Sequence, residues 1–193
     1  MFDAIFFPLD AIARAKAERS MTKTLLLLLG ASLLTALSAF LMTQHWEMAV
    51  TVFVGVFLLN LFIAFLIKIA LHVLIQRGGF YESLTALSLG YYISSFGFLV
   101  VVLIGMIPGD ELSMTLVKGV LSGIALLSLL LLSAMTLFRA TMEFFQVDLL
   151  TVVVTFTTLY LLLFISLYLG LLKIVFPLMF GLMGSSLPPV PLG

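Results

Sequence analysis

Long apolar segments separated by short charged connections constrain this chain more than any other feature of its sequence. Five such segments are long enough to cross the roughly 30 Å hydrocarbon core of a bilayer, which takes about 20 helical residues. They cover residues 24–42, 48–69, 83–107, 114–138 and 149–172. Because lipid cannot bond to backbone polar groups, we expect all five to be α-helices. The sequence therefore predicts an all-α, polytopic membrane protein with five transmembrane helices.

The composition favours the same environment. Of the 193 residues, 63% are hydrophobic and 9% are charged, whereas a soluble domain has about 45–50% apolar and about 25% charged residues. The formal net charge is zero, which gives no electrostatic reason to expect a nucleic-acid partner. Cysteine is absent, which excludes disulfides and thiol catalysis. We expect one membrane domain, no extramembrane catalytic unit and no cofactor.

The charge of the connections alternates along the chain. Arg77 precedes the third segment and Arg139 precedes the fifth, whereas the connection 43–47 has no Lys or Arg and the next outer connection has only Asp110 and Glu111. Four basic residues precede the first segment: Arg14, Lys16, Arg19 and Lys23. Lys and Arg are retained on the cytoplasmic side of a membrane. This pattern predicts a cytoplasmic N-terminus and an external C-terminus.

The two ends of the chain differ from the membrane segments between them. Residues 1–20 contain Pro8, which can open a helix, and their spacing predicts an amphipathic helix on the cytoplasmic interface rather than a frayed basic leader. Residues 21–184 would form the five-helix membrane domain. Within it, 174–184 is either a kinked continuation of the fifth helix or an interfacial segment. Residues 185–193 form a Pro-rich tail.

Ionisable side chains inside a membrane segment are the first candidates for a transport path. Lys68 and His72 lie one helical turn apart in the second segment, and Asn60 lies two turns earlier near the same face. Such a stripe could carry protons, but Lys68 is close enough to the inner end to extend its ammonium group to the interface. We favour anchoring as its role. His45 and His72 fall on opposite sides of the predicted membrane, so we expect no metal site.

Small residues indicate where membrane helices can approach closely. Gly119 and Gly123 are four residues apart in the fourth segment, and Gly90 belongs to a similar stripe in the third. We favour packing within one chain over packing between chains. Tyr91 and Tyr92 follow at mid-depth, where their hydroxyls need hydrogen-bond partners. Three threonines of the fifth segment could supply those bonds: Thr155, Thr157 and Thr158.

Three features resemble the Yip family, the Rab/Ypt-interacting membrane proteins and their prokaryotic relatives. They are the Phe6-Phe7-Pro8 leader with its basic stretch, the Gly-Gly-Phe-Tyr-Glu-Ser entry at 78–83 with the later Gly90-Tyr91-Tyr92, and the five segments after a cytoplasmic N-terminus. Phe96-Gly97-Phe98 stands where a proline is often found, and the Asp-Leu-Tyr-Gly-Pro motif of eukaryotic members is absent. Binding of Rab-type GTPases is therefore not carried over to this chain from the resemblance. The resemblance implies a non-enzymatic integral membrane protein in a prokaryotic cell membrane.

Two functions follow from these observations. The first is a scaffold or adaptor that organises membrane lipids or protein partners at its cytoplasmic face, where residues 139–148 are predicted to form an interfacial turn, and that can also self-associate. The second is a small transporter or substrate-binding membrane subunit. It would need a polar cavity at mid-depth lined by Asn60, Lys68, His72, Tyr91 and Tyr92. A pocket at that depth would favour the transporter, and a solid core would favour the scaffold.

Overall fold

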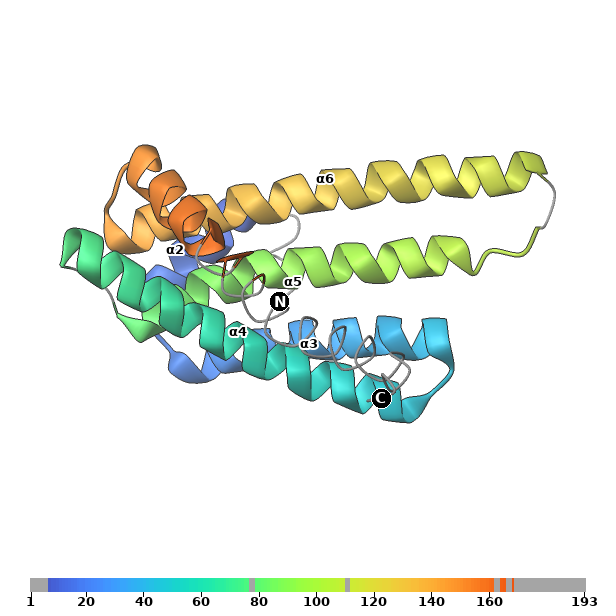
Figure 1. Cartoon of the computed structure of the whole chain (residues 1–193), viewed down its shortest axis with the longest axis horizontal. Helices are drawn as coiled ribbons and strands as arrows, with labels where there is room; N and C mark the ends of the chain where they lie inside the picture. Colours follow the sequence, from blue (N-terminus) through green and yellow to red (C-terminus); the bar gives the residue numbers. More distant parts are fainter. Residues whose placement is uncertain (1–6, 77–78, 110–111, 162–163, 166–167, 169–193) are drawn as a thin grey trace, which may run out of the picture. The chain divides into compact units, whose positions relative to one another are not determined.

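The computed structural model of the chain is helical in all the elements it describes (Figure 1). It describes residues 7–76, 79–109, 112–161, 164–165 and 168. The labelled helices are α2 (Pro8–Glu18), α3 (Met21–Thr43), α4 (Trp46–Ile75), α5 (Phe80–Gly105) and α6 (Leu112–Phe145). A shorter apolar helix covers Leu149–Leu161. No strand occurs among these residues, so the all-α prediction is confirmed.

Four helices are long and apolar enough to cross a membrane, one fewer than predicted. They lie within α3, α4, α5 and α6, and their apolar parts are Met21–Thr43, Trp46–Leu74, Phe80–Gly105 and Ser113–Phe145. The fifth predicted segment begins as a helix, but its continuous described part, Leu149–Leu161, is too short for a crossing of about 20 residues. The segments 174–184 and 185–193 lie outside the described residues.

The chain divides into two compact units, Met1–Thr155 and Phe156–Gly193. In the second unit the described residues are helical, and the rings of Tyr160 and Phe164 stack with centroids 6.4 Å apart. Both side chains are exposed. The helices α2 to α6 all belong to the first unit.

Three helices of the first unit are followed by a glutamine in the left-handed backbone conformation. Gln44, Gln76 and Gln146 follow α3, α4 and α6, with φ values of 58°, 52° and 55°. A left-handed residue after a helix lets its N–H bond one of the last helical carbonyls. At the start of α3, the Ser20 hydroxyl accepts a hydrogen bond from the Lys23 N–H at 3.4 Å, as an N-cap does. These polar residues end the helices where the apolar runs stop.

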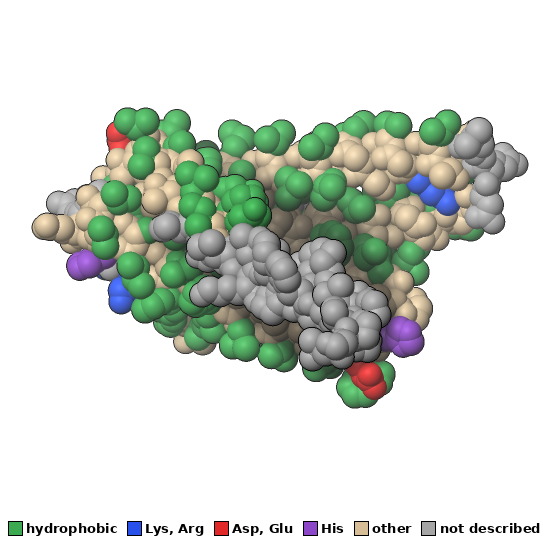
Figure 2. Space-filling model, in the orientation of Figure 1, with side chains coloured by type: hydrophobic (Ala, Val, Ile, Leu, Met, Phe, Trp, Pro, Cys, Tyr) green, Lys and Arg blue, Asp and Glu red, His purple; other side chains and the backbone are tan. Residues whose placement is uncertain are grey.

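The core of the first unit forms around α5, which packs against α3, α4 and α6 (Figure 1). Leu84 and Ile93 of α5 are completely buried. Large apolar side chains elsewhere point outward, among them Leu58 and Phe62 of α4 and Leu127 of α6. Figure 2 shows apolar side chains spread over the visible face. Soluble monomers rarely expose apolar surface on this scale, so the distribution suits contact with lipid.

The end of α6 differs from the prediction. We expected the helix to stop at Phe138 and residues 139–148 to form an interfacial turn, but α6 continues to Phe145. Ala140 and Phe145 are buried, and Arg139 forms an ion pair with Glu143 one turn later at 3.0 Å. Burial and this pair keep the segment helical, which a count of charged residues does not reveal.

The second segment was also predicted too short. We placed its end at Ile69, whereas α4 runs to Ile75. Ala64, Ile67 and Leu71 are all buried, at a spacing that puts them on one face of the helix. This packed face continues past the predicted end, and its burial keeps the following residues helical.

Residues 8–18 form α2, a separate helix rather than an extension of α3. Arg19 adopts a left-handed conformation with φ of 41° and breaks the helix before Ser20. Ile12 of α2 is buried, and α2 packs against α5 and α6. The Tyr81 hydroxyl of α5 donates a hydrogen bond to the Ala15 carbonyl at 3.0 Å. The helix α2 is therefore held against the ends of two long helices.

Candidate functional site

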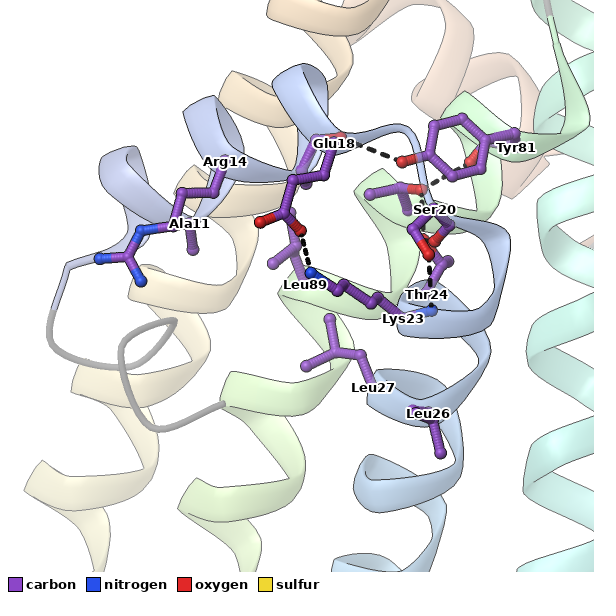
Figure 3. A pocket seen from close by; sticks show the side chains of 12 residues that line it. Ala11, Arg14, Glu18, Ser20, Lys23, Thr24, Leu26, Leu27, Tyr81 and Leu89 are labelled. Carbon is purple, nitrogen blue, oxygen red and sulfur yellow. Dashed lines mark hydrogen bonds and ion pairs between the residues drawn. The ribbon is translucent and has the colours of Figure 1, made fainter.

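A pocket of about 240 Å³ lies between α2, α3 and the start of α5 (Figure 3). The break at Arg19 and Ser20 separates α2 from α3 and so creates the space between them. Its lining combines charged, hydroxyl and apolar side chains from the three helices. These residues are Ala11, Arg14, Ala15, Glu18, Ser20, Lys23, Thr24, Leu26, Leu27, Tyr81, Thr85 and Leu89.

The charged part of this pocket contains two cations and one carboxylate. The Lys23 ammonium group lies 2.6 Å from a Glu18 carboxylate oxygen, and both side chains are about half exposed or more. Arg14 lies one helical turn before Glu18 on α2, with its guanidinium directed away from Lys23 in Figure 3. An exposed pair such as Lys23–Glu18 contributes about 0–1 kcal/mol. A competing anion could therefore separate it at little cost.

Hydroxyl groups close the deeper side of the pocket and join the helices. The buried Thr24 and Thr85 hydroxyls lie 2.9 Å apart, which links α3 to α5. Thr85 also donates to the Tyr81 carbonyl at 2.7 Å. The Thr24 hydroxyl also donates to the Ser20 carbonyl at 3.3 Å. These bonds fix the walls of the pocket, and Ser20, which accepts the Lys23 N–H, keeps its hydroxyl hydrogen for donation to a ligand.

The apolar part of the pocket lies further along α3 and α5. Leu89 is only 4% exposed and forms part of the buried core, and Leu27 packs against that core. Leu26 is 50% exposed and lies at the open side. The lining thus changes from charged to apolar over two turns of α3. This arrangement can hold an amphiphilic molecule, with its polar group near Lys23 and its apolar part along Leu26.

A second pocket, of about 560 Å³, lies between α2 and the end of α6. Glu143 lies there between two cations, 3.5 Å from Lys16 and 3.0 Å from Arg139. All three side chains are substantially exposed. The Lys16–Glu143 pair joins α2 to α6, and the Arg139–Glu143 pair lies within α6. Among the described residues, no three His, Asp or Glu side chains are grouped as metal ligands would be.

Of the residues predicted to form a transport stripe, Asn60 lies on a different part of the helix surface from Lys68 and His72. Asn60 is 5% exposed, and its amide nitrogen donates to the Val56 carbonyl at 2.9 Å. Lys68 is half-buried with its ammonium group 5.9 Å from the Phe65 ring centroid, and His72 is exposed. At about 100° per residue, Lys68 and His72 lie about 80° and about 120° around the helix from Asn60. None of these residues lines either pocket.

The tyrosine pair occupies helix–helix contacts. The Tyr91 hydroxyl lies 2.6 Å from the Thr35 hydroxyl of α3, and Thr35 lies 3.1 Å from the Ser95 hydroxyl. We had placed the partner of Tyr91 on the fifth segment, so that prediction was wrong for Tyr91. Tyr92 is 5% exposed and belongs to the buried core. Neither tyrosine lines the two described pockets.

Glycines mark the contact between α5 and α6, but only on α5. A Cβ atom at Gly90 would lie 3.0 Å from Leu137 Cβ, and the Ser133 hydroxyl donates to the Gly90 carbonyl at 2.7 Å. Gly119 and Gly123 would have nothing within 4 Å of an added Cβ. Packing of these two glycines against other described residues, which we favoured, is therefore not found.

The pocket between α2, α3 and α5 was missed by sequence reasoning. Its basic residues, Arg14 and Lys23, had been interpreted as topology signals and Tyr81 as part of a helix entry, and Thr85 had not been singled out. The available signal was the sequence Glu18-Arg19-Ser20-Met21-Thr22-Lys23, which breaks one helix and caps the next. Comparison with family models, curated proteins and solved structures finds no match to this chain.

Proposed function

We propose that this protein is a non-enzymatic integral membrane protein that acts as a scaffold or adaptor, of the Yip type that its sequence resembles. The observation that carries the proposal is the use of mid-helix polar groups. Many hydroxyl groups of the long helices, and the Asn60 amide, bond to neighbouring helices or to their own backbone. A transporter would instead need such groups to face a path through the protein.

Three contacts support this interpretation. The Tyr91 hydroxyl bonds the Thr35 hydroxyl, the Ser133 hydroxyl bonds the Gly90 carbonyl, and the Asn60 amide bonds its own helix. Packing and interhelical hydrogen bonds drive helix association in lipid. A bundle held together in this way offers its outer surface and its ends to other molecules. Its partners would be lipids around the helices and proteins at the end that carries α2.

The orientation that we propose places α2 on the cytoplasmic side. Consecutive helices alternate in direction, so the same side of the bundle holds the start of α3, the end of α4, the start of α5 and the end of α6 (Figure 1). This side carries most of the basic residues: Arg14, Lys16, Arg19, Lys23 and Arg139. Positive charge is retained in the cytoplasm. We propose that α2 lies on the interface of a prokaryotic cell membrane.

The helix that begins at Leu149 would then start on the cytoplasmic side. We propose that it continues as a fifth crossing and that the C-terminus is external. The residues of 149–172 are apolar over a length that suits a bilayer. This step follows from the sequence of the segment and from the side on which its helix begins.

A photo-crosslinking experiment tests the scaffold proposal. A photoreactive amino acid is placed at Ala13 on the exposed face of α2, and a matched control is placed at Gln44 at the other end of the bundle. A scaffold with partners at its cytoplasmic face should give discrete protein adducts from Ala13 and none from Gln44. Adducts from both positions alike, or from neither, would contradict the proposal.

A flux assay tests the rejected alternative. In proteoliposomes with an imposed pH gradient, wild type and a Lys68→Met, His72→Ala double variant should leak protons equally, because neither side chain lines a described pocket. A strong flux in wild type that the double variant lacks would favour a transporter instead.

A further inference from the structure

We propose that the pocket between α2, α3 and α5 binds the headgroup of an anionic phospholipid. The inference rests on the proposed membrane function, because the ligand must reach the pocket from a bilayer. It goes beyond that function by assigning a ligand class and the residues that recognise it. The recognising groups are the Lys23 ammonium group and the Ser20 hydroxyl, with the apolar part of the ligand along Leu26; a second cation, Arg14, also lines the pocket.

The order of the side chains in the pocket matches the order of groups in a phospholipid. Lys23 and Ser20 lie at the charged end of α3, and Leu26 and Leu27 lie one turn further toward the apolar part of the same helix. Figure 3 shows this change along the helix. A phospholipid has its phosphate at the interface and its acyl chains deeper. The pocket therefore offers cations and a hydroxyl at the depth of the phosphate and leucines at the depth of the first methylenes.

The volume of the pocket also suits a headgroup. Pockets for drug-sized ligands usually have about 300–1,000 Å³, and this one has about 240 Å³. A whole phospholipid would not fit, but a glycerophosphate group would. The acyl chains would leave the pocket past Leu26, which is half exposed. The exposed apolar surface of α3 continues there with Leu29 and Leu33.

The Lys23 ammonium group is the charge in the pocket that can select an anion. It lines the pocket together with Ser20, whereas the Arg14 guanidinium is directed away from Lys23 (Figure 3). Lys23 pairs with Glu18 at 2.6 Å, but both groups are exposed to water. A phosphate with several acceptor oxygens can take the ammonium from the carboxylate, because charge-assisted bonds to phosphate are strong. Glu18 then competes with the ligand for Lys23. Removal of the Glu18 charge should therefore strengthen ligand binding, whereas removal of the Lys23 charge should weaken it.

The test measures lipid binding to the purified full chain by native mass spectrometry. Delipidated protein is titrated with phosphatidylglycerol, with phosphatidylcholine of the same acyl chains, and with water-soluble glycerol 3-phosphate. The variants are Lys23→Gln, Glu18→Gln and, as a matched control with the same charge change at the other end of the bundle, Lys118→Gln. Circular dichroism and gel filtration identify any variant that fails to fold.

Phosphatidylglycerol should bind more tightly than phosphatidylcholine, and glycerol 3-phosphate should bind weakest, because it lacks the apolar part. Lys23→Gln should weaken phosphatidylglycerol binding about tenfold, as loss of one charge-assisted hydrogen bond implies. Glu18→Gln should strengthen it severalfold, and Lys118→Gln should leave it unchanged. A merely structural Lys23–Glu18 pair would make both variants change binding in the same direction.

Three results would overturn the proposal. They are equal binding of the two lipids, an equal loss in Lys23→Gln and Lys118→Gln, and a fall in binding in Glu18→Gln. If the Lys23→Gln variant does not fold, the proposal is tested by whether phosphatidylglycerol binding rises in the Glu18→Gln variant. If the chain reconstitutes into proteoliposomes but does not prefer phosphatidylglycerol, the lipid site alone is refuted. If the chain does not reconstitute into proteoliposomes, the membrane function is refuted as well.

Discussion

Replacing Gly90 with leucine should destabilise the protein far more than the same replacement at Gly123. A Cβ atom at position 90 would lie 3.0 Å from Leu137 Cβ and 3.1 Å from the Ser133 carbonyl oxygen, whereas nothing lies within 4 Å of one at position 123. Carbon atoms in contact are usually about 3.5–4.0 Å apart. In the Gly90→Leu variant, α5 and α6 must therefore separate or repack.

The size of the difference follows from two terms. Inserting carbon atoms into a packed contact typically costs about 1–3 kcal/mol. Separation of the helices also breaks the 2.7 Å bond from the Ser133 hydroxyl to the Gly90 carbonyl, which contributes about 0.5–1.5 kcal/mol. Both variants gain the higher helix propensity of leucine, so this gain cancels in the comparison. We expect Gly90→Leu to be less stable than Gly123→Leu by about 2–4 kcal/mol.

Unfolding by SDS in mixed micelles, followed by circular dichroism, gives the free energy of unfolding of each variant. Gly97→Leu serves as a second test position, because its Cβ would lie 2.8 Å from Leu129 Cβ. It should behave like Gly90→Leu. Equal unfolding midpoints for the Gly90 and Gly123 variants would refute the reasoning, since the close approach of α5 and α6 would then contribute nothing to stability.

Three further predictions address the ends of the bundle. Single cysteines at Gln44 and Glu111 should react with a membrane-impermeant reagent from outside and one at Gly78 should not; labelling of position 78 alone would reverse the orientation. Tyr81→Phe removes the hydroxyl that bonds α2 and should speed hydrogen exchange in α2 at a cost of about 1 kcal/mol; unchanged exchange would contradict this contact. A hydrogen bond from Thr151 lowers the pKa of the Asp148 carboxyl. The stabilisation of the fold by ionised Asp148 is therefore present above about pH 4 and is lost as pH falls through that lowered pKa. Carboxyl NMR should find the Asp148 midpoint below 3.9, and an ordinary or raised value would show that Asp148 does not cap the helix that begins at Leu149.

The helical class and the positions of the long apolar helices could be predicted from this sequence, but which face of each helix packs could not. The apolar segments identify α3 to α6 because their length and composition alone separate them from soluble helices. A helix that is apolar on all sides has no periodicity to show which face packs. This explains the opposite outcomes for two glycine stripes. A Cβ atom at Gly90 would meet α6, whereas one at Gly119 would have no described atom within 4 Å.

The candidate site was missed for a different reason. Its lining comes from α2, α3 and α5, and Glu18 and Tyr81 are far apart in the sequence. Only the fold of α2 back onto α5 brings them together, through the bond from Tyr81 to Ala15. The basic residues near the N-terminus were correctly noticed. Their pattern indicated a side of the membrane, and it contained no information about a cavity.

The length of α6 explains why the pockets and charges gather at one end. Its 34 residues span about 51 Å at 1.5 Å per residue, which exceeds the roughly 30 Å hydrocarbon core. Some turns must therefore leave the core unless the helix is strongly tilted. The turn from Arg139 to Glu143 carries charges that favour this position, and α2 packs against it through Lys16. Ala140 of this projecting part is buried in one cluster with Ile12 of α2. A short helix laid against long ones cannot fill all the space beneath it, and both described pockets border α2 for this reason.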